Sequence, residues 1–402
     1  MPVLIVDEFV SFTLAIMLLF AGKILTLRTE LLRRYSIPEP VIGGFICAAV
    51  VAFAYYVLGT QIQFELQVRD LLMLYFFAAI GLKADLRTLL KGGRPLLVLL
   101  LLASVFIVLQ NLLGMGVATA FGLEPRAGLM AGSISLTGGV GTTLAWAPQF
   151  VEQLGIANAM ELGIASNTLG LIAACMLGGP IARYLMQRHR LQPSDNTHLD
   201  IGRSYEEEQP KLDYYGVLWA WMGLNVALLL GQGIAETLES AGLNLPRFVS
   251  CLLAGILIRN LLPHLLGRQL ARNWPGAQQG LALISDICLG MFLTMALMSL
   301  RLWELQSVFF FILVAIGLQL LLCIAYILLV VFRCMGRDYE AAVICAGFGG
   351  ISLGSTATAV VNMTAVAQQY GAAHRAFILV PLVCGFFIDL VNALVIHFFT
   401  GL

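Results

Sequence analysis

The sequence is poor in charged residues, and this scarcity excludes several classes of protein. Asp, Glu, Lys and Arg make up only 11% of the 402 residues, while 59% are hydrophobic and the mean hydropathy is +0.89. An ordinary soluble domain carries roughly 25% charged residues. Acidic and basic residues balance at 23 each, with no basic run of the kind that binds nucleic acid. The composition therefore excludes an ordinary soluble domain and a nucleic-acid-binding protein, and it makes the lipid bilayer the expected partner.

Sequence patterns for catalysis and for metal chelation are also missing. The eight cysteines show no C-x-x-C spacing, and the five histidines show no metal-ligand spacing. No Ser/His/Asp, phosphate-loop or paired-carboxylate arrangement is found in the sequence. We therefore expect a protein that is not an enzyme and whose cysteines contribute only to packing.

What the sequence does contain is a series of long apolar runs, since a helix needs ~20 such residues to cross a bilayer. These runs predict ten spans, at residues 9–27, 40–58, 71–90, 95–121, 156–178, 214–235, 247–262, 281–300, 306–332 and 374–399. The only long polar stretch, 187–213, is interpreted as a linker. It divides the chain into an N-terminal five-span repeat, 1–186, and a C-terminal five-span repeat, 214–402.

The distribution of Lys and Arg predicts the orientation of these spans. With the N-terminus outside, 19 of the 23 basic residues fall on the inner side of the membrane. Because cytoplasmic loops carry the excess of Lys and Arg, both termini should face outward and the linker inward. Asp7 and Glu8 precede the first run without a basic segment, so we expect that run to be a retained span.

The two halves are expected to be related repeats. An offset of about 208 to 216 residues pairs Asp70 with Asp286 and places Ser133–Thr143 beside Gly347–Ala357. Because each half has an odd number of spans, the second half should enter the membrane upside down. We expect Asp70 and Asp286 to begin helices, where a carboxylate stabilises the N-terminus.

Each half carries a segment rich in Gly, Ser and Thr, at residues 127–147 and 341–360. Both segments are too apolar for a loop and too rich in glycine for a lipid-facing helix. Main-chain groups freed from a helix cannot face lipid, so such segments persist only inside the protein or beside a water-filled cavity. We interpret them as re-entrant hairpins that enter from opposite sides and meet near the midplane. The alternative is that they are small-residue packing surfaces between helices.

The tips of these hairpins form the predicted substrate site. Glycines allow close approach to the main chain, broken helices present N–H groups to anions, and carbonyl and hydroxyl oxygens suit a cation such as Na⁺. No Lys or Arg occurs in residues 127–151 or 341–369, so main-chain N–H groups, hydroxyls and bound cations would have to meet an anionic substrate. The candidate substrate-binding residues are Ser135, Thr137, Gly138, Gly139, Gly141, Thr142, Gly350, Ser352, Gly354, Ser355, Thr356 and Thr358.

Polar residues within the spans are the candidates for ion binding. Asp389 and Asn392 are three residues apart in the last span and therefore share one helix face. A carboxylate at mid-span costs at least ~2.5 kcal/mol and is rarely kept without a partner or an ion. We predict that Asp389, Asn392, Asn362 and Asn167 hold Na⁺ or support the hairpins. For Asp389 the alternative is a buried carboxylate satisfied by neighbouring helices.

Motifs distributed over nearly the whole chain carry a family resemblance. They include Ile37-Pro-Glu-Pro40, Gln110-Asn111, Gly138-Gly-Val-Gly-Thr142, Ala359-Val-Val-Asn362 and Phe386-Phe-Ile-Asp-Leu-Val-Asn392. Through these motifs the sequence resembles the bacterial sodium/glutamate symporter family.

The resemblance implies Na⁺-coupled uptake of L-glutamate across a bacterial inner membrane. It also implies an all-α polytopic membrane protein made of two inverted five-span repeats with re-entrant loops, acting as a homodimer by an elevator movement. Both termini would then be periplasmic and the linker cytoplasmic. Val140 and Phe348 stand where the family motifs can carry His, and Arg375 stands where an apolar residue is expected. A Na⁺-coupled symporter of another di- or tricarboxylate or of a hydroxycarboxylate stays open as an alternative, as does a channel.

Overall fold

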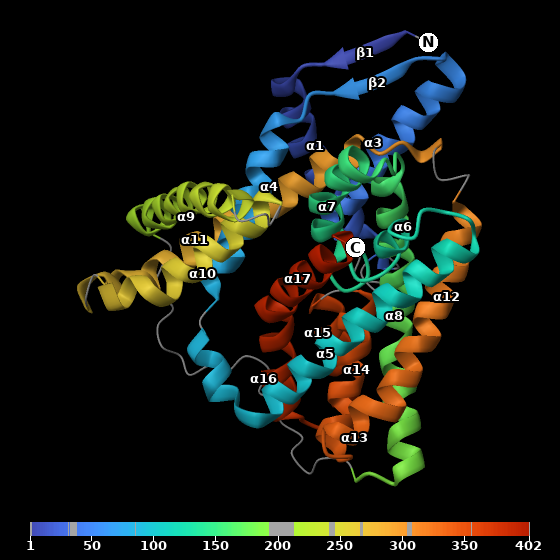
Figure 1. Ribbon diagram of the computed structural model, residues 1–402, viewed down its shortest axis with the longest axis vertical. Helices are drawn as coiled ribbons and strands as arrows, with labels where there is room; N and C mark the ends of the chain where they lie inside the picture. The colour runs from blue at the N-terminus through green and yellow to red at the C-terminus, as the bar shows by residue number, and fades with distance from the viewer. Residues whose placement is uncertain are drawn as a thin grey trace. The chain divides into compact units, whose positions relative to one another are not determined.

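The computed structural model describes residues 2–30, 32, 38–84, 86–192, 213–240, 246–265, 268–303, 308–354 and 356–401. Figure 1 shows that helices dominate these residues. Most of the predicted linker, residues 193–212, lies outside the described residues.

Within the described residues, seven helices are long and apolar enough to cross a membrane. They occupy Glu8–Arg28, Glu39–Leu58, Gly93–Ala120, Ala159–His189, Tyr214–Ser240, Ala277–Met298 and Phe309–Cys334. The other three predicted spans fall on shorter or less apolar helical runs, at Gln67–Lys83, Arg247–Leu265 and His374–Thr400. The prediction of a nearly all-helical, multi-span membrane protein is confirmed.

The chain folds into two compact units, each of which combines residues from both halves of the sequence. Unit 1 comprises residues 1–30, 37–87 and 204–303, and unit 2 comprises 31–36, 88–203 and 304–402. The elements of unit 1 are β1 (Val3–Val6), α1 (Glu8–Arg28), α3 (Glu39–Phe53), the π-helix η1 (Ala54–Leu58), β2 (Gln61–Phe64), α4 (Gln67–Lys83), α9 (Tyr214–Ser240), α10 (Arg247–Leu265) and α11 (Arg268–Met298).

Small residues allow the helices of unit 1 to pack closely. A Cβ atom added to Gly81 of α4 would lie 2.2 Å from the carbonyl oxygen of Leu252 on α10, and one added to Gly255 of α10 would lie 2.6 Å from the carbonyl oxygen of Ala78 on α4. A Cβ at Gly22 of α1 would likewise lie 2.2 Å from the carbonyl oxygen of Glu39 on α3. Close helix crossings at small residues are typical of membrane proteins, in which van der Waals packing drives helix association.

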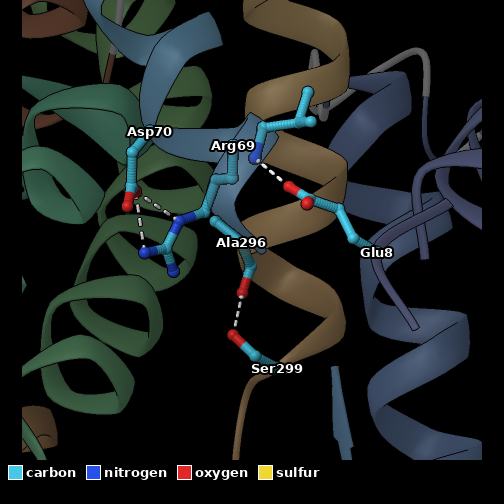
Figure 2. A network of polar contacts seen from close by, with 6 residues as sticks. Glu8, Arg69, Asp70, Ala296 and Ser299 are labelled. Atoms are coloured by element: carbon cyan, nitrogen blue, oxygen red, sulfur yellow. Dashed lines mark hydrogen bonds and ion pairs between the residues drawn. The ribbon is translucent and has the colours of Figure 1, made fainter. Parts of the chain in front are cut away.

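Unit 1 also contains a small parallel sheet that was not predicted from the sequence. Strands β1 and β2 pair from Val3 with Gln61 to Val6 with Phe64, and they lie side by side in Figure 1. Just beyond the sheet, a carboxylate oxygen of Glu8 accepts a 2.7 Å hydrogen bond from the main-chain N–H of Val68, near the start of α4 (Figure 2). Four-residue strands are too short to show a clear hydropathy pattern, so pattern analysis passed over them.

Asp70 and Asp286 were both predicted to begin helices, and the prediction holds for Asp70 only. Asp70 lies in the first turn of α4, where its carboxylate pairs with Arg69 at 2.8 Å (Figure 2). Asp286 instead lies well inside α11, which begins at Arg268. The prediction for Asp286 was wrong because hydropathy marks where a helix becomes apolar, whereas α11 starts in the preceding polar residues.

Unit 2 carries both glycine-rich segments. Its elements are most of α5 (Leu86–Ala120), then α6 (Ala127–Met130), α7 (Gly139–Leu154), α8 (Ala159–His189), α12 (Phe309–Tyr326), η3 (Ile327–Val331), α13 (Phe332–Cys334), α14 (Tyr339–Leu353), α15 (Thr356–Tyr370), α16 (His374–Leu382), η4 (Val383–Phe387) and α17 (Ile388–Thr400). Helix α5 kinks at Gly93, whose φ of 62° is unfavourable for other residues. The side-chain carboxylate of Glu340 on α14 accepts hydrogen bonds from the main-chain N–H groups of Arg375 and Ala376, which lie in the first turn of α16.

Candidate ion and substrate site

The first glycine-rich segment interrupts its helix completely. Residues 131–138 form a series of turns between α6 and α7, and residues 131–137 are all buried. Within the turns, the N–H of Gly138 donates to the carbonyl of Ser133 at 2.9 Å and that of Gly139 donates to Ser135 at 3.1 Å. Irregular main chain at membrane depth requires such partners, because neither lipid nor apolar side chains can supply them.

Side-chain amides from three other helices complete this bonding. Asn167 on α8 donates to the carbonyl of Ser135 at 2.7 Å, and Asn392 on α17 donates to the carbonyl of Ser133 at 3.1 Å. The N–H of Ser133 in turn donates to the side-chain oxygen of Asn111 on α5 at 2.9 Å. The break is therefore held by side chains that are distant from it in the sequence.

The second break lies at the end of α14, next to the first. Helix α14 ends at Leu353, and α15 begins at Thr356 after Gly354, whose φ and ψ of −144° and −97° are not helical. The carbonyl of Ser352 accepts a 2.8 Å hydrogen bond from the side-chain amide of Gln110. It also lies 3.4 Å from the hydroxyl of Thr137 in the first break. The two breaks thus contact each other within unit 2.

Glycines permit this approach. A Cβ atom at Gly170 of α8 would lie 2.4 Å from Leu136 Cδ2 in the first break and 2.6 Å from the carbonyl oxygen of Leu353 in the second. Gly139, with a φ of +74°, would place a Cβ 3.8 Å from the carbonyl oxygen of Gly354. Only glycine at position 170 leaves room for α8 against both breaks.

The structure brings some of the predicted substrate residues together and separates others. Ser135, Thr137, Gly138 and Gly139 form the first break, and Ser352 and Gly354 lie at the second. Gly141 and Thr142 follow in the first turns of α7. The remaining positions differ in environment. Gly350 packs against α15, Thr358 is buried on α15, Thr356 is exposed, and Ser355 lies outside the described residues.

The four predicted ion-binding residues lie in three different settings. Asn167 and Asn392 bond directly to the first break, as described above. Asn362 on α15 instead donates to the carbonyls of Ala174 on α8 at 2.9 Å and Ala346 on α14 at 3.4 Å, so it connects the helices around the second break. Asp389 lies one turn before Asn392 on α17 and is partly exposed.

Several buried polar atoms near the first break have no hydrogen-bond partner among the described residues. They are Asn111 Nδ2, Ser133 Oγ, Ser135 Oγ, Ser166 Oγ, Gln319 Oε1 and Asn392 Oδ1. All six side chains are at most 1% exposed. An unpaired buried polar atom costs roughly 1–3 kcal/mol, so a group of them in one region marks a place where ordered water, an ion or another polar ligand would bind. Five of the six are oxygens, the ligand type that a hard cation prefers.

Sequence reasoning missed part of this cluster. Gln110 and Asn111 were noted in the sequence only as part of a family motif. Ser166 and Gln319 were not predicted as site residues. Gln319 is the one amide in the apolar helix α12, and that isolation could have marked it as a candidate. Its partners could not be inferred, because they belong to α5 and to the first break.

Phe348, near the second break, is buried among aromatic side chains. Its ring lies 5.6 Å from that of Phe106 on α5 and 5.9 Å from that of Tyr326 on α12. The Tyr326 hydroxyl donates to the carbonyl of Leu102 at 2.9 Å. Phe348 therefore belongs to an aromatic cluster that joins α5, α12 and α14.

The spans and the paired breaks define the class of protein. A multi-span membrane protein in which buried helix interruptions adjoin unpaired oxygens has the organisation of a carrier for small polar solutes.

Comparison with known sequences gives the family. The model of the sodium/glutamate symporter family matches residues 4–372, and the chain belongs to that family. A sodium/glutamate symporter of Haemophilus influenzae is 38% identical over 95% of this chain and 94% of its own length. One of Escherichia coli is 36% identical over 98% of this chain and 97% of its own length.

Proposed function

We propose that this protein couples the entry of Na⁺ to the uptake of L-glutamate across a bacterial inner membrane. Family membership provides the context, and the observation that carries the proposal is the cluster of unpaired buried oxygens beside the first break. Both relatives are named as sodium/glutamate symporters. No observation favours the alternative carboxylates.

Sodium would bind on the side of the first break that faces Asn392. Ser133, Ser135 and Asn392 each carry an unpaired side-chain oxygen. Asn392 bonds the main-chain carbonyl of Ser133, and Ser135 lies two residues further along the chain. Among the described residues, no three His, Cys, Asp or Glu side chains lie close enough to hold a metal ion. Neutral amide and hydroxyl oxygens would thus form most of the coordination, with Asp389, Asn362 and Asn167 supporting the ion or the breaks.

The glutamate carboxylates would be met by the main chain. Helix α7 starts at Gly139 without a side-chain cap, and the Gly139 N–H already donates to the carbonyl of Ser135. The N–H groups of Val140, Gly141 and Thr142 in the same first turn would be the ones that meet an anion. Residues 127–151 and 341–369 contain no Lys or Arg. Bound Na⁺ would supply the missing positive charge, which gives the coupling between ion and substrate a physical cause.

The proposed architecture follows the sequence analysis. The chain would consist of two inverted five-span repeats, 1–186 and 214–402, with residues 127–147 and 341–360 as re-entrant hairpins and 187–213 as a cytoplasmic linker. Both termini would be periplasmic. Because both breaks lie in unit 2, we further propose that unit 2 carries the substrate in an elevator movement within a homodimer.

Uptake of labelled L-glutamate into proteoliposomes tests this function. An inward Na⁺ gradient should drive accumulation, and collapse of the gradient with a Na⁺ ionophore should abolish it. Competition by aspartate, citrate and malate at equal concentrations measures the preference between glutamate and the alternative substrates. Uptake that is indifferent to the Na⁺ gradient would refute the coupling.

A further inference from the structure

Gln110 on α5 joins the two breaks through a single side chain. Its Nε2 donates to the carbonyl of Ser352 at 2.8 Å, and its Oε1 accepts from the hydroxyl of Thr137 at 2.8 Å. The side chain is completely buried. Ser352 lies in the last turn of α14, where main-chain carbonyls have no N–H partner within the helix. The side-chain amide of Gln110 supplies the missing hydrogen-bond donor.

Gln319 on α12 extends this connection to the beginning of the first break. Its Nε2 donates to the main-chain carbonyl of Gln110 at 2.8 Å and lies 3.5 Å from the carbonyl of Ala131. Gln319 is also completely buried, and its Oε1 has no hydrogen-bond partner among the described residues. A continuous set of contacts therefore runs from Ala131 through both glutamines to Ser352.

The two glutamines occupy matching places in the two halves. They are 209 residues apart, within the offset that relates the halves, and each lies in the fourth predicted span of its half. Gln110, from the N-terminal half, bonds the break of the C-terminal half. Gln319, from the C-terminal half, approaches the break of the N-terminal half. The connection is thus crossed between the halves.

We propose that Gln110 and Gln319 are positioning residues that couple the two breaks, so that the geometry of one break sets the ligand affinity of the other. The proposal rests on the function proposed above. Gln110 holds the carbonyl of Ser352 and the hydroxyl of Thr137 at fixed positions, and Gln319 fixes the main chain from which Gln110 extends. A residue that merely fills space between α5 and α12 would have no such directional bonds.

A double-mutant cycle on Gln110 and Thr137 tests the coupling. Gln110→Met keeps the length of the side chain and removes the amide, and Thr137→Val keeps the shape and removes the hydroxyl. Each variant should raise the half-saturating glutamate concentration about tenfold, the effect of losing a buried hydrogen bond. The double variant should be no worse than Gln110→Met alone, since that change already removes the bond to Thr137 together with the bond to Ser352. Thr137→Ser should restore most of the lost affinity.

Ser104→Ala is the matched control on α5. The Ser104 hydroxyl donates to the carbonyl of Leu100 in its own helix at 2.7 Å, so its removal should change neither affinity nor stability appreciably. If the two single effects multiply in the double variant, or if Gln110→Met lowers only thermal stability, the coupling is refuted. If Gln110→Met fails to fold, the same cycle with Gln319→Met and Thr137→Val decides the question. Na⁺-driven uptake by the unchanged protein separately tests the proposed function.

Discussion

The side-chain amide of Asn392 donates a 3.1 Å hydrogen bond to the main-chain carbonyl of Ser133. Helix α17 lies near the end of the chain, whereas Ser133 belongs to the turns between α6 and α7. The bond thus ties the last helix to the first break. Because the oxygen of the same amide has no partner among the described residues, Asn392 has one group that holds the break and another that is available to a ligand.

Replacing Asn392 with Leu should weaken sodium binding. The substitution removes the donor to Ser133 and a candidate Na⁺ ligand while it keeps the approximate size. Loss of a buried hydrogen bond that leaves its partner unpaired costs about 1–3 kcal/mol, so the half-saturating Na⁺ concentration should rise about tenfold. The dependence of glutamate uptake on Na⁺ concentration measures this effect. Asn158→Leu, at the start of α8 where the side chain makes no capping bond, is the control and should leave the Na⁺ dependence unchanged.

Adding a single methyl group at Gly170 should disrupt both breaks together. The new Cβ would lie 2.6 Å from the carbonyl oxygen of Leu353 and 2.4 Å from Leu136, so Gly170→Ala must displace α8. Overpacking of this kind costs about 1–3 kcal/mol. Gly179, on the same helix, has no atom within 4 Å of an added Cβ and provides the matched control. Uptake and melting temperature should fall for Gly170→Ala only, and equal effects of the two substitutions would contradict the packing described for α8.

Glu340 should stabilise unit 2 by capping α16. Its two carboxylate oxygens accept the N–H groups of Arg375 and Ala376 at 3.2 and 2.8 Å. Loss of a helix cap costs about 0.5–2 kcal/mol. Glu340→Ala should therefore lower the melting temperature of the purified protein, and Glu340→Gln, which keeps one acceptor oxygen, should have a smaller effect. Glu152→Ala removes an exposed carboxylate from α7 and should be neutral. A fully stable Glu340→Ala variant would show that the cap is dispensable.

The two carboxylates shown in Figure 2, Glu8 and Asp70, should differ in their contribution to stability. Glu8 reaches 60 residues along the chain to the N–H of Val68, whereas the Asp70 side chain is 58% exposed and pairs with the adjacent Arg69. Exposed ion pairs contribute about 0–1 kcal/mol, while a hydrogen bond to a charged group contributes about 1.5–3 kcal/mol. Glu8→Gln should thus destabilise the protein more than Asp70→Asn in thermal unfolding. The reverse order would contradict this assignment.

The sequence could predict features that depend on local composition. Hydropathy located the spans because each run is apolar on its own. The high local content of Gly, Ser and Thr located both breaks, because these residues weaken a helix without by themselves ending it. The contacts of these breaks could not be predicted in the same way. Gln110 meets Ser352 across 242 residues, and Asn392 meets Ser133 across 259, distances along the chain at which only tertiary folding decides proximity.

The division into two units also escaped sequence analysis. The polar segment 187–213 separates the two halves by composition, whereas the compact units each combine parts of both halves. Packing between α4 and α10 of unit 1 depends on Gly81 and Gly255, which lie in different halves. Hydropathy describes each helix separately and contains no information on which helix packs against which.

The parallel pairing of β1 with β2 constrains the order of events during synthesis. Strand β1 precedes α1 and strand β2 follows α3 and η1, so both helices must be in place before the two strands can meet. A nascent chain in which either helix was misplaced would expose an unpaired strand edge, the kind of surface that invites aggregation or proteolysis. Pairing of the two short strands therefore depends on the placement of both helices that separate them in the sequence.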